Sequence, residues 1–272
     1  MRKAAIQIIR VTALAYAGFM LVLASCQRGM IYHPTRRTEA EAVRRAAWEA
    51  LEPWRGANGE IIGWRPVHAR EEGDAMVLFH GNAGDAPARS YFAEGFAPWM
   101  AVHLFEYPGY GPRGGTPSEQ AFAEAGEAAV RQLRRERAGR IFLGGESLGT
   151  GVACRLAGAH PELISGLFLS TPFTRMADVA RSHHPLYPAG WLMRDRYDSA
   201  LHLQGYAGPV AILLAGRDEV VPARLGRRLY DAYEGPKQIW IQPDRSHNTV
   251  DYAEDNAWWG EVAGFLQGNA RP

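Results

Sequence analysis

The sequence predicts an α/β fold with a mostly parallel sheet flanked by helices. From residue 75 onward, short apolar runs alternate with helical patterns, as expected for strands buried on both faces of a sheet. Glycine-rich or polar clusters follow these runs, where parallel sheets place their ligands. A chain of 272 residues is long enough for one such domain.

Composition excludes several classes of protein. Hydrophobic residues make up 47% and charged residues 22%, which is typical of a globular chain. The net charge of +1, without a basic stripe, argues against nucleic acid as a partner. Two cysteines cannot build a disulfide framework, and no Cys/His spacing resembles a zinc site. We expect neither a metal nor a cofactor.

The first 26 residues read as a targeting or anchoring segment. Arg2 and Lys3 form a basic start, and the run 11–25 carries no charge. This run is shorter than the ~20 residues that a spanning helix needs and suits the core of a signal peptide. The alternative is an uncleaved inner-membrane anchor, with Arg10 near one interface. Either route tethers the protein to a membrane.

The end of this segment, Leu23-Ala24-Ser25-Cys26, resembles the lipobox of bacterial lipoproteins. The resemblance implies that Cys26 becomes the lipidated N-terminus after cleavage. Gln27, rather than Asp, resembles the signal for the outer membrane. The localisation expected from this is a lipoprotein facing the periplasm.

Two further regions complete the expected organisation. Residues 27–50 form a membrane-proximal segment with a helix near 39–50, opened by a Thr38/Glu41 capping box. The domain proper covers 51–272 and starts with a hairpin around Asn58-Gly59. Proline- and glycine-rich residues 172–206 interrupt the alternation and predict a small cap beside the site; a surface excursion without a substrate role is the alternative.

The remaining elements follow the hydrophobic pattern. We expect a capping box at Thr116–Glu119 to open a helix that runs to about 136. Strands are expected at 51–55, 60–67, 75–79, 101–107, 163–169, 209–215 and 238–242, and further helices at 87–98, 222–234 and 250–266.

The most informative stretch is an apolar run that ends in Gly145-Glu146-Ser147-Leu148-Gly149, followed by a small-residue helical pattern. Gly-x-Ser-x-Gly between a strand and a helix predicts a sharp turn that exposes the Ser147 hydroxyl. A Cβ at Gly145 or Gly149 would crowd this turn. A serine hydroxyl becomes a nucleophile only with a base, and the base needs an orienting acid.

Candidates for both partners follow later strands. Asp218 ends an apolar strand in a loop, and His247 lies after the last strand, which gives the order nucleophile, acid, histidine. Glu219 and Asp244 are weaker candidates for the acid. For the oxyanion, we expect the backbone N–H of Leu148 and that of Asn82, with Ala83 as the second choice. His80 is expected to shape the loop as a buried, hydrogen-bonded residue.

Five motifs together resemble the α/β-hydrolases, especially membrane-anchored serine hydrolases: His80–Gly84, Tyr107–Gly111, Gly145–Gly149, Asp218–Pro222 and Ser246–Asn248. Glu106 stands where that family usually has Asp, and Ser246 where it usually has Gly, with little expected effect. The resemblance implies an α/β-hydrolase fold and the hydrolysis of an ester, thioester or related acyl bond.

The sequence therefore predicts a tethered serine hydrolase that acts on a small acyl ester or thioester through Ser147, His247 and Asp218. Trp191, Tyr107 and Tyr110 are candidate walls of an acyl pocket, although core packing is an alternative for the tyrosines. The competing hypothesis is a non-catalytic hydrolase-fold lipoprotein that binds a ligand or partner.

Overall fold

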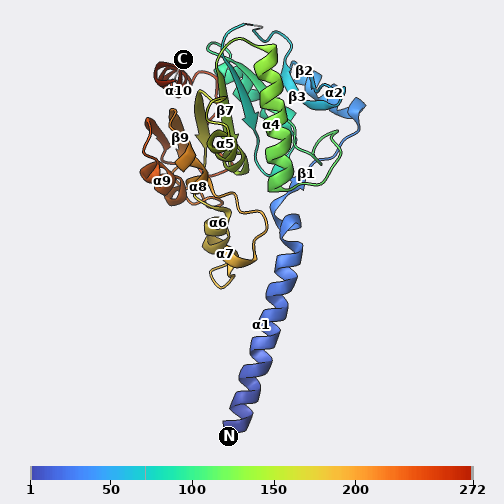
Figure 1. Ribbon diagram of the computed structural model, residues 1–272, viewed down its shortest axis with the longest axis vertical. Helices are drawn as coiled ribbons and strands as arrows, with labels where there is room; N and C mark the ends of the chain where they lie inside the picture. The colour runs from blue at the N-terminus through green and yellow to red at the C-terminus, as the bar shows by residue number, and fades with distance from the viewer. Residues whose placement is uncertain (1, 71, 271–272) are drawn as a thin grey trace.

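The computed structural model describes residues 2–70 and 72–270 and confirms an α/β fold around an eight-stranded sheet (Figure 1). The strand order is β10-β9-β8-β7-β4-β6-β3-β2. All neighbours pair in parallel except β3, which is antiparallel to both β2 and β6. The strands are β2 (Leu51–Arg55), β3 (Ile61–Pro66), β4 (Ala75–Phe79), β6 (Ala101–Phe105), β7 (Ile141–Glu146), β8 (Gly166–Ser170), β9 (Val210–Ala215) and β10 (Lys237–Gln242).

Helices cover both faces of the sheet. One hydrophobic cluster joins the sheet to α4 (Glu119–Glu136), α5 (Leu148–Ala159) and α9 (Ala223–Ala232). Another joins the opposite face to α2 (Glu39–Trp48), α3 (Ser90–Phe96) and α10 (Trp258–Asn269). A 3-10 turn, η1 (Ala86–Arg89), leads into α3. Burial on both faces explains why β4 and β9 are apolar throughout rather than alternating.

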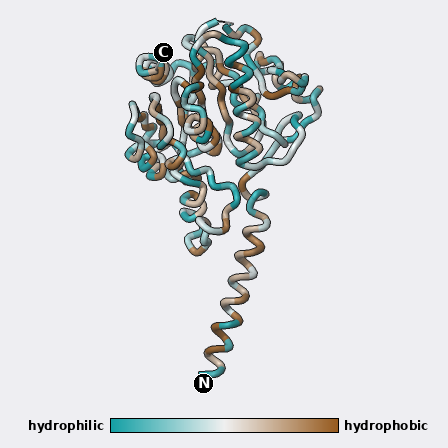
Figure 2. Tube along the Cα trace, viewed as in Figure 1, coloured by the Kyte–Doolittle hydropathy of each residue, from teal (hydrophilic) through white to brown (hydrophobic). Residues whose placement is uncertain are grey.

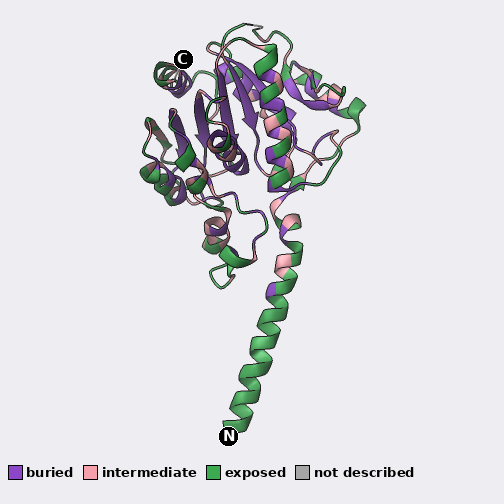
Figure 3. Cartoon of the chain, in the orientation of Figure 1, coloured by how far each residue is buried: buried purple, intermediate pink, exposed green. Residues whose placement is uncertain are grey.

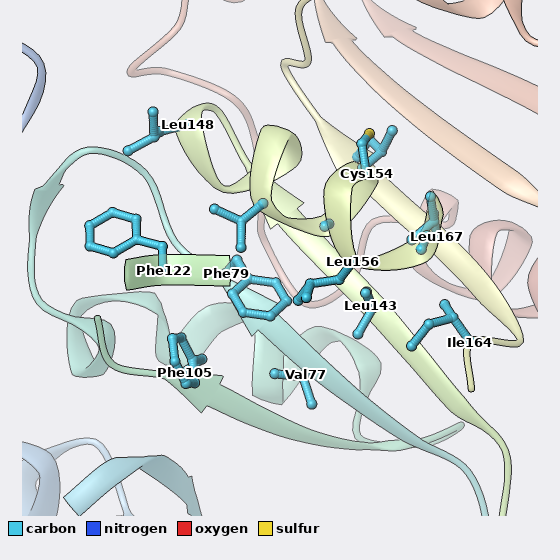
Figure 4. Packing of buried hydrophobic residues seen from close by; sticks show 14 of the residues in the cluster. Val77, Phe79, Phe105, Phe122, Leu143, Leu148, Cys154, Leu156, Ile164 and Leu167 are labelled. Atoms are coloured by element: carbon cyan, nitrogen blue, oxygen red, sulfur yellow. The ribbon is translucent and has the colours of Figure 1, made fainter. Parts of the chain in front are cut away.

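Figure 4 shows part of the first cluster, in which β4, β6 and β7 meet α4 and α5. Phe79 and Phe105 pack edge to face with ring centroids 5.2 Å apart. Tyr107 stacks on Phe122 of α4 at 4.0 Å. Tyr107 and Tyr110 are both fully buried, so the core-packing interpretation of these tyrosines is correct.

Two predicted helix starts are wrong. α4 begins at Glu119, because the Ser118 hydroxyl, not that of Thr116, accepts the capping bond, from Ala121 N–H. α10 begins at Trp258 rather than near 250. The Gln242 side chain binds both the N–H (2.7 Å) and the carbonyl (3.0 Å) of Asp251, and so holds the preceding segment in a turn at the end of β10.

The N-terminal segment forms one helix, α1 (Arg2–Ile31), that projects from the domain (Figure 1). It is long and apolar enough to cross a membrane, and it exposes most of its length (Figures 2 and 3). The helix exceeds the predicted apolar run because the residues that flank this run on both sides are also helical. The expected boundary between residues 26 and 27 lies inside α1.

After α1 the chain enters a separate two-stranded sheet. β1 (His33–Pro34) pairs in parallel with β5 (Ala83–Gly84), which follows the carboxyl end of β4. The predicted cap at 172–206 contains α6 (Met176–His183), α7 (Ala189–Leu192), α8 (Ser199–His202) and η2 (Leu203–Gly205). α6 and α7 extend beside α1 below the sheet (Figure 1).

Candidate active site

The turn between β7 and α5 holds Ser147 in a strained conformation. Its φ of 52° and ψ of −115° are rare for a residue with a Cβ. The turn is tight because β7 passes directly into α5: a Cβ on Gly149 would lie 1.9 Å from the Phe79 carbonyl oxygen, and one on Gly145 2.6 Å from Thr150 N. The strain lifts the Ser147 hydroxyl to the carboxyl edge of the sheet.

The loops after β9 and β10 are joined to one another. Gly216 N–H donates to the Gln242 carbonyl (2.9 Å), and Arg217 N–H donates to the Arg245 carbonyl (2.9 Å). Because β9 and β10 are parallel neighbours, these bonds place Asp218 and His247 at the same edge as the Ser147 turn.

A continuous chain of hydrogen bonds links the three side chains. His247 Nε2 lies 3.0 Å from Ser147 Oγ, and His247 Nδ1 lies 2.7 Å from Asp218 Oδ2. With the proton on Nδ1, the imidazole donates to the carboxylate and Nε2 accepts from the hydroxyl. The structure therefore brings together the three residues that the sequence singled out, within reach of proton transfer.

Asp218 is fixed by its own loop. Its Oδ1 accepts from the backbone N–H groups of Val220 (2.9 Å) and Val221 (2.7 Å), which leaves Oδ2 for His247. The weaker candidates point elsewhere: Glu219 is exposed, and Asp244 pairs with Arg217 at 2.6 Å. Asp218 is thus the carboxylate that orients the imidazole.

The two residues expected to supply the oxyanion donors lie near Ser147, one next to it in the chain and one in the same cavity. Leu148 is the first residue of α5, where N–H groups have no partner within the helix and the dipole favours a negative charge. Asn82 lines the same cavity as Ser147 and His247. Its carbonyl accepts from His33 N–H (2.9 Å) and Tyr110 OH (2.7 Å), and its side chain donates to the Ile31 carbonyl (2.8 Å). This loop is therefore held by the end of α1.

A largely buried ion pair supports the loop. Glu146, next to the serine, accepts from Arg89 Nε (2.8 Å), Gly81 N–H (3.0 Å) and Tyr91 OH (3.0 Å). Burial alone raises the pKa of Glu146, but the Arg89 charge and these donors outweigh it and hold the pKa below its usual range. No motif in the sequence points to Arg89 or Tyr91, and the signal for them is Glu146 itself, because a glutamate inside the turn needs a cation or hydrogen-bond donors nearby.

The two departures from the family pattern are accommodated. The buried Glu106 carboxylate accepts from Trp64 Nε1 (3.1 Å) and Ala86 N–H (3.2 Å). It lies 3.5 Å from Nε2 of His80, which is buried and whose Nδ1 bonds to the Gly81 carbonyl oxygen (2.7 Å). His80 thus shapes the loop as expected. Ser246 N–H is used within its own turn, by Thr249 Oγ1 at 2.9 Å.

A cavity of about 480 Å³ opens at the serine. Its walls include Tyr91, Thr171, Val220 and Tyr252, besides the catalytic candidates. Trp191 was a candidate wall, but it lies on α7 with 91% of its surface exposed and does not line this cavity, so that prediction is wrong. Among the described residues, no group of three or more His, Cys, Asp or Glu side chains is arranged to hold a metal ion.

Comparison with known proteins agrees with the fold. The family model for the α/β hydrolase fold matches residues 74–205. An uncharacterized protein of Mycobacterium tuberculosis, Rv2307c, is 32% identical over 272 residues, covering 97% of this chain and 96% of that protein. The chain belongs to the α/β-hydrolase family.

Other similar proteins carry names that state an activity. The lysophosphatidylserine lipase ABHD12 of Danio rerio is 29% identical over 226 residues, which cover 73% of this chain and 58% of that protein. Among solved structures, Est1E from Butyrivibrio proteoclasticus has a TM-score of 0.64 at 15% identity and covers 81% of this chain and 98% of its own. A Pyrococcus furiosus esterase, PF2001, has a TM-score of 0.63 at 16% identity, with coverage of 88% and 97%. At these identities the structural likeness concerns the fold alone.

Proposed function

We propose that this protein is a serine hydrolase that cleaves an acyl ester or thioester through an acyl-enzyme. The hydrogen-bonded series Ser147, His247 and Asp218, at 3.0 and 2.7 Å, carries the proposal. His247 takes the proton of Ser147 as the hydroxyl attacks the acyl carbonyl, and then gives it to the leaving group. Asp218 fixes the tautomer of His247 and stabilises its positive charge.

The tetrahedral intermediate carries its negative charge on the former carbonyl oxygen. The backbone N–H groups of Leu148 and Asn82 are the proposed donors to that oxygen, each contributing a few kcal/mol. In the second half of the reaction, His247 activates a water that attacks the acyl-enzyme and regenerates Ser147. These steps require neither a metal nor a cofactor.

Relatives suggest the substrate class. The name lipase in the relative that is 29% identical favours an oxygen ester, with a thioester as the variant of the same chemistry. The cavity of about 480 Å³ can accommodate a small acyl group. Turnover of acyl esters of graded chain length is the measurement that defines the preference.

Covalent labelling tests the proposal. A fluorophosphonate probe should label the wild-type protein, and Ser147→Ala and His247→Ala should abolish or strongly reduce labelling. Ser165→Ala, which removes a hydroxyl remote from the cavity, should label like wild type. Equal labelling of wild type and Ser147→Ala would disprove the proposal.

The competing function is that of a binding module. It predicts a ligand or partner that is retained equally by wild type and Ser147→Ala, with no turnover of any acyl substrate. The intact hydrogen-bond series speaks against it, because a protein that only binds does not need an imidazole aligned between a carboxylate and a hydroxyl.

Membrane attachment through the N-terminus is the second part of the proposal. A lipidated Cys26 and an uncleaved α1 remain the two routes; Cys26 is exposed, as lipidation requires. Mass spectrometry of the mature protein discriminates between them, since the first route predicts a chain that begins at lipidated Cys26 and faces the periplasm. An intact N-terminus would reject that route and leave the inner-membrane anchor.

A further inference from the structure

The tip of the cap is a continuous stretch without charge. Residues 185–193 read Pro-Leu-Tyr-Pro-Ala-Gly-Trp-Leu-Met, between His184 and Arg194. Leu186 and Trp191 expose 80% and 91% of their surfaces at this tip. Single exposed apolar residues are common on protein surfaces, but a cluster of them marks a surface that binds a membrane or another protein.

The tip is attached to α1. The Tyr16 hydroxyl donates to the Leu186 carbonyl. Further along α1, Gln27 donates to the Leu192 carbonyl (3.1 Å) and accepts from Arg194 N–H (2.7 Å). Tyr16 lies roughly 18 Å from Arg28 along the helix, at the rise of an α-helix. The tip therefore runs alongside the apolar part of α1.

The backbone of the tip is suited to an apolar medium. Two prolines remove N–H groups, and most of the others bond within the tip, as Trp191 does to Pro188 (3.0 Å) and Met193 to Ala189 (3.1 Å). The carbonyls of Leu186 and Leu192 accept from α1. Internal satisfaction of this kind lowers the cost of placing irregular backbone among hydrocarbon chains.

Between α1 and the tip lies a groove of about 370 Å³ with a predominantly apolar lining. Phe19, Met20 and Leu23 line one side, and Leu186, Tyr187 and Met193 the other. The exposed Arg194 and Arg196 follow the tip, near Gln27 and Arg28 in the last turns of α1. An apolar surface bordered by arginines matches the membrane interface, where the acyl chains meet the phosphate headgroups.

We propose that the cap tip, residues 185–193, inserts into the membrane leaflet beside the N-terminal anchor, and that phospholipid acyl chains occupy the groove. α1 attaches the protein to the membrane, and the tip enlarges the apolar surface that α1 presents to the lipid. Gln27 and Arg28, which hold the cap, follow Cys26, so insertion of the tip is compatible with a lipidated N-terminus. The groove, which Phe19, Met20 and Leu23 line on one side, requires the uncleaved helix. The inference rests on membrane attachment, not on hydrolysis.

Two exposed tryptophans provide a matched test. Trp191 is at the tip, whereas Trp48, 83% exposed, ends α2 on a different part of the domain (Figure 1). The full-length protein, Trp191→Phe and Trp48→Phe are reconstituted into phosphatidylcholine–phosphatidylglycerol vesicles with or without brominated acyl chains. The difference between the wild-type and Trp191→Phe spectra gives the emission of Trp191, which should be blue-shifted and largely quenched by the brominated chains. The emission lost with Trp48→Phe should be unquenched.

An unquenched Trp191 in vesicles that hold the protein would overturn the proposal and leave the tip to a protein partner or a second copy. Fluorophosphonate labelling of the same samples reports on Ser147 separately. If Ser147 is labelled but Trp191 is not quenched, insertion of the tip is refuted and the hydrolase proposal stands. If Trp191 is quenched but Ser147 is not labelled, the hydrolase proposal is refuted and insertion stands.

Discussion

At the residue scale, the carboxylate of Glu146 connects the nucleophile turn to the oxyanion loop. It precedes Ser147 in the chain and binds the N–H of Gly81, which precedes Asn82. The Arg89 charge keeps this buried group ionised. A charged acceptor holds a backbone N–H more strongly than a neutral one. We therefore predict that Glu146, which also lines the cavity, acts by positioning the proposed oxyanion donor.

Glu146→Gln should lower kcat about tenfold with little change in KM, because an oxyanion donor acts mainly in the transition state. The measurement is ester hydrolysis under saturating and limiting substrate. Glu234→Gln alters an exposed glutamate and is the matched control. A change in KM alone would contradict the positioning role and indicate a substrate contact.

We expect His103 to make the stability of the fold depend on pH. It is buried in β6 against Trp54, with ring centroids 4.8 Å apart, and burial lowers its pKa to about 3. In the unfolded chain His103 binds a proton below about pH 6.5, whereas in the folded chain it does so only below about pH 3. The free energy of unfolding therefore falls as the pH drops from about 6.5 towards 3. The expected loss is about 1.4 kcal/mol per pH unit. His103→Leu should therefore reduce the difference in Tm between pH 7.5 and pH 5, whereas His68→Leu, at an exposed site, should not.

At the scale of elements, the passage from β7 into α5 depends on glycine. Gly149→Ala should prevent folding or destabilise the protein by several kcal/mol, because its Cβ would overlap the Phe79 carbonyl. Gly264→Ala on α10 meets nothing within 4 Å and should be neutral or stabilising by about 0.5–1 kcal/mol. Thermal unfolding and the yield of folded protein are the measurements. Similar stabilities for the two variants would contradict this account of the turn.

The elements were predictable where one local signal dominated. β4 was placed at 75–79 because every residue in it is apolar, which reflects burial on both faces. The start of α10 was misplaced because Asp251 is held by the Gln242 side chain, a contact that periodicity cannot reveal. The true cap of α4, Ser118, was overlooked because Thr116 offers the same chemistry two residues earlier.

The candidate site was predictable to the extent that its residues follow strands of a parallel sheet. Ser147, Asp218 and His247 each follow a strand, and parallel strands deliver their ends to one edge. The partners of Glu146 were not predictable: Arg89 follows a different strand and reaches Glu146 through the geometry of η1. Trp191 failed as a pocket wall because sequence gives no direction for a side chain on an irregular cap.

At the scale of the whole molecule, Asp195 joins three parts of the protein. It is almost fully buried in the cap. Its carboxylate accepts from Arg28 of α1, at 2.8 and 3.2 Å, and from the backbone N–H of Glu119 at the start of α4 (3.1 Å). Asp195 therefore connects the anchor, the cap and the domain. We expect the orientation of the cap tip relative to the membrane to depend on this residue.

Asp195→Asn should weaken all three contacts, because a neutral amide loses the ionic attraction to Arg28 and the favourable charge at the N-terminus of α4. We expect a loss of about 1–3 kcal/mol in the free energy of unfolding and faster hydrogen exchange in residues 185–194. Asp244→Asn removes the same charge from a pair whose side chains are 72% and 76% exposed, and should change stability by less than about 0.5 kcal/mol. Thermal unfolding and hydrogen-exchange mass spectrometry of the two variants, reconstituted into phosphatidylcholine–phosphatidylglycerol vesicles, check both effects. Unchanged exchange at the tip in Asp195→Asn would mean that the Tyr16 and Gln27 contacts suffice to orient the cap, and that the ion pair serves stability alone.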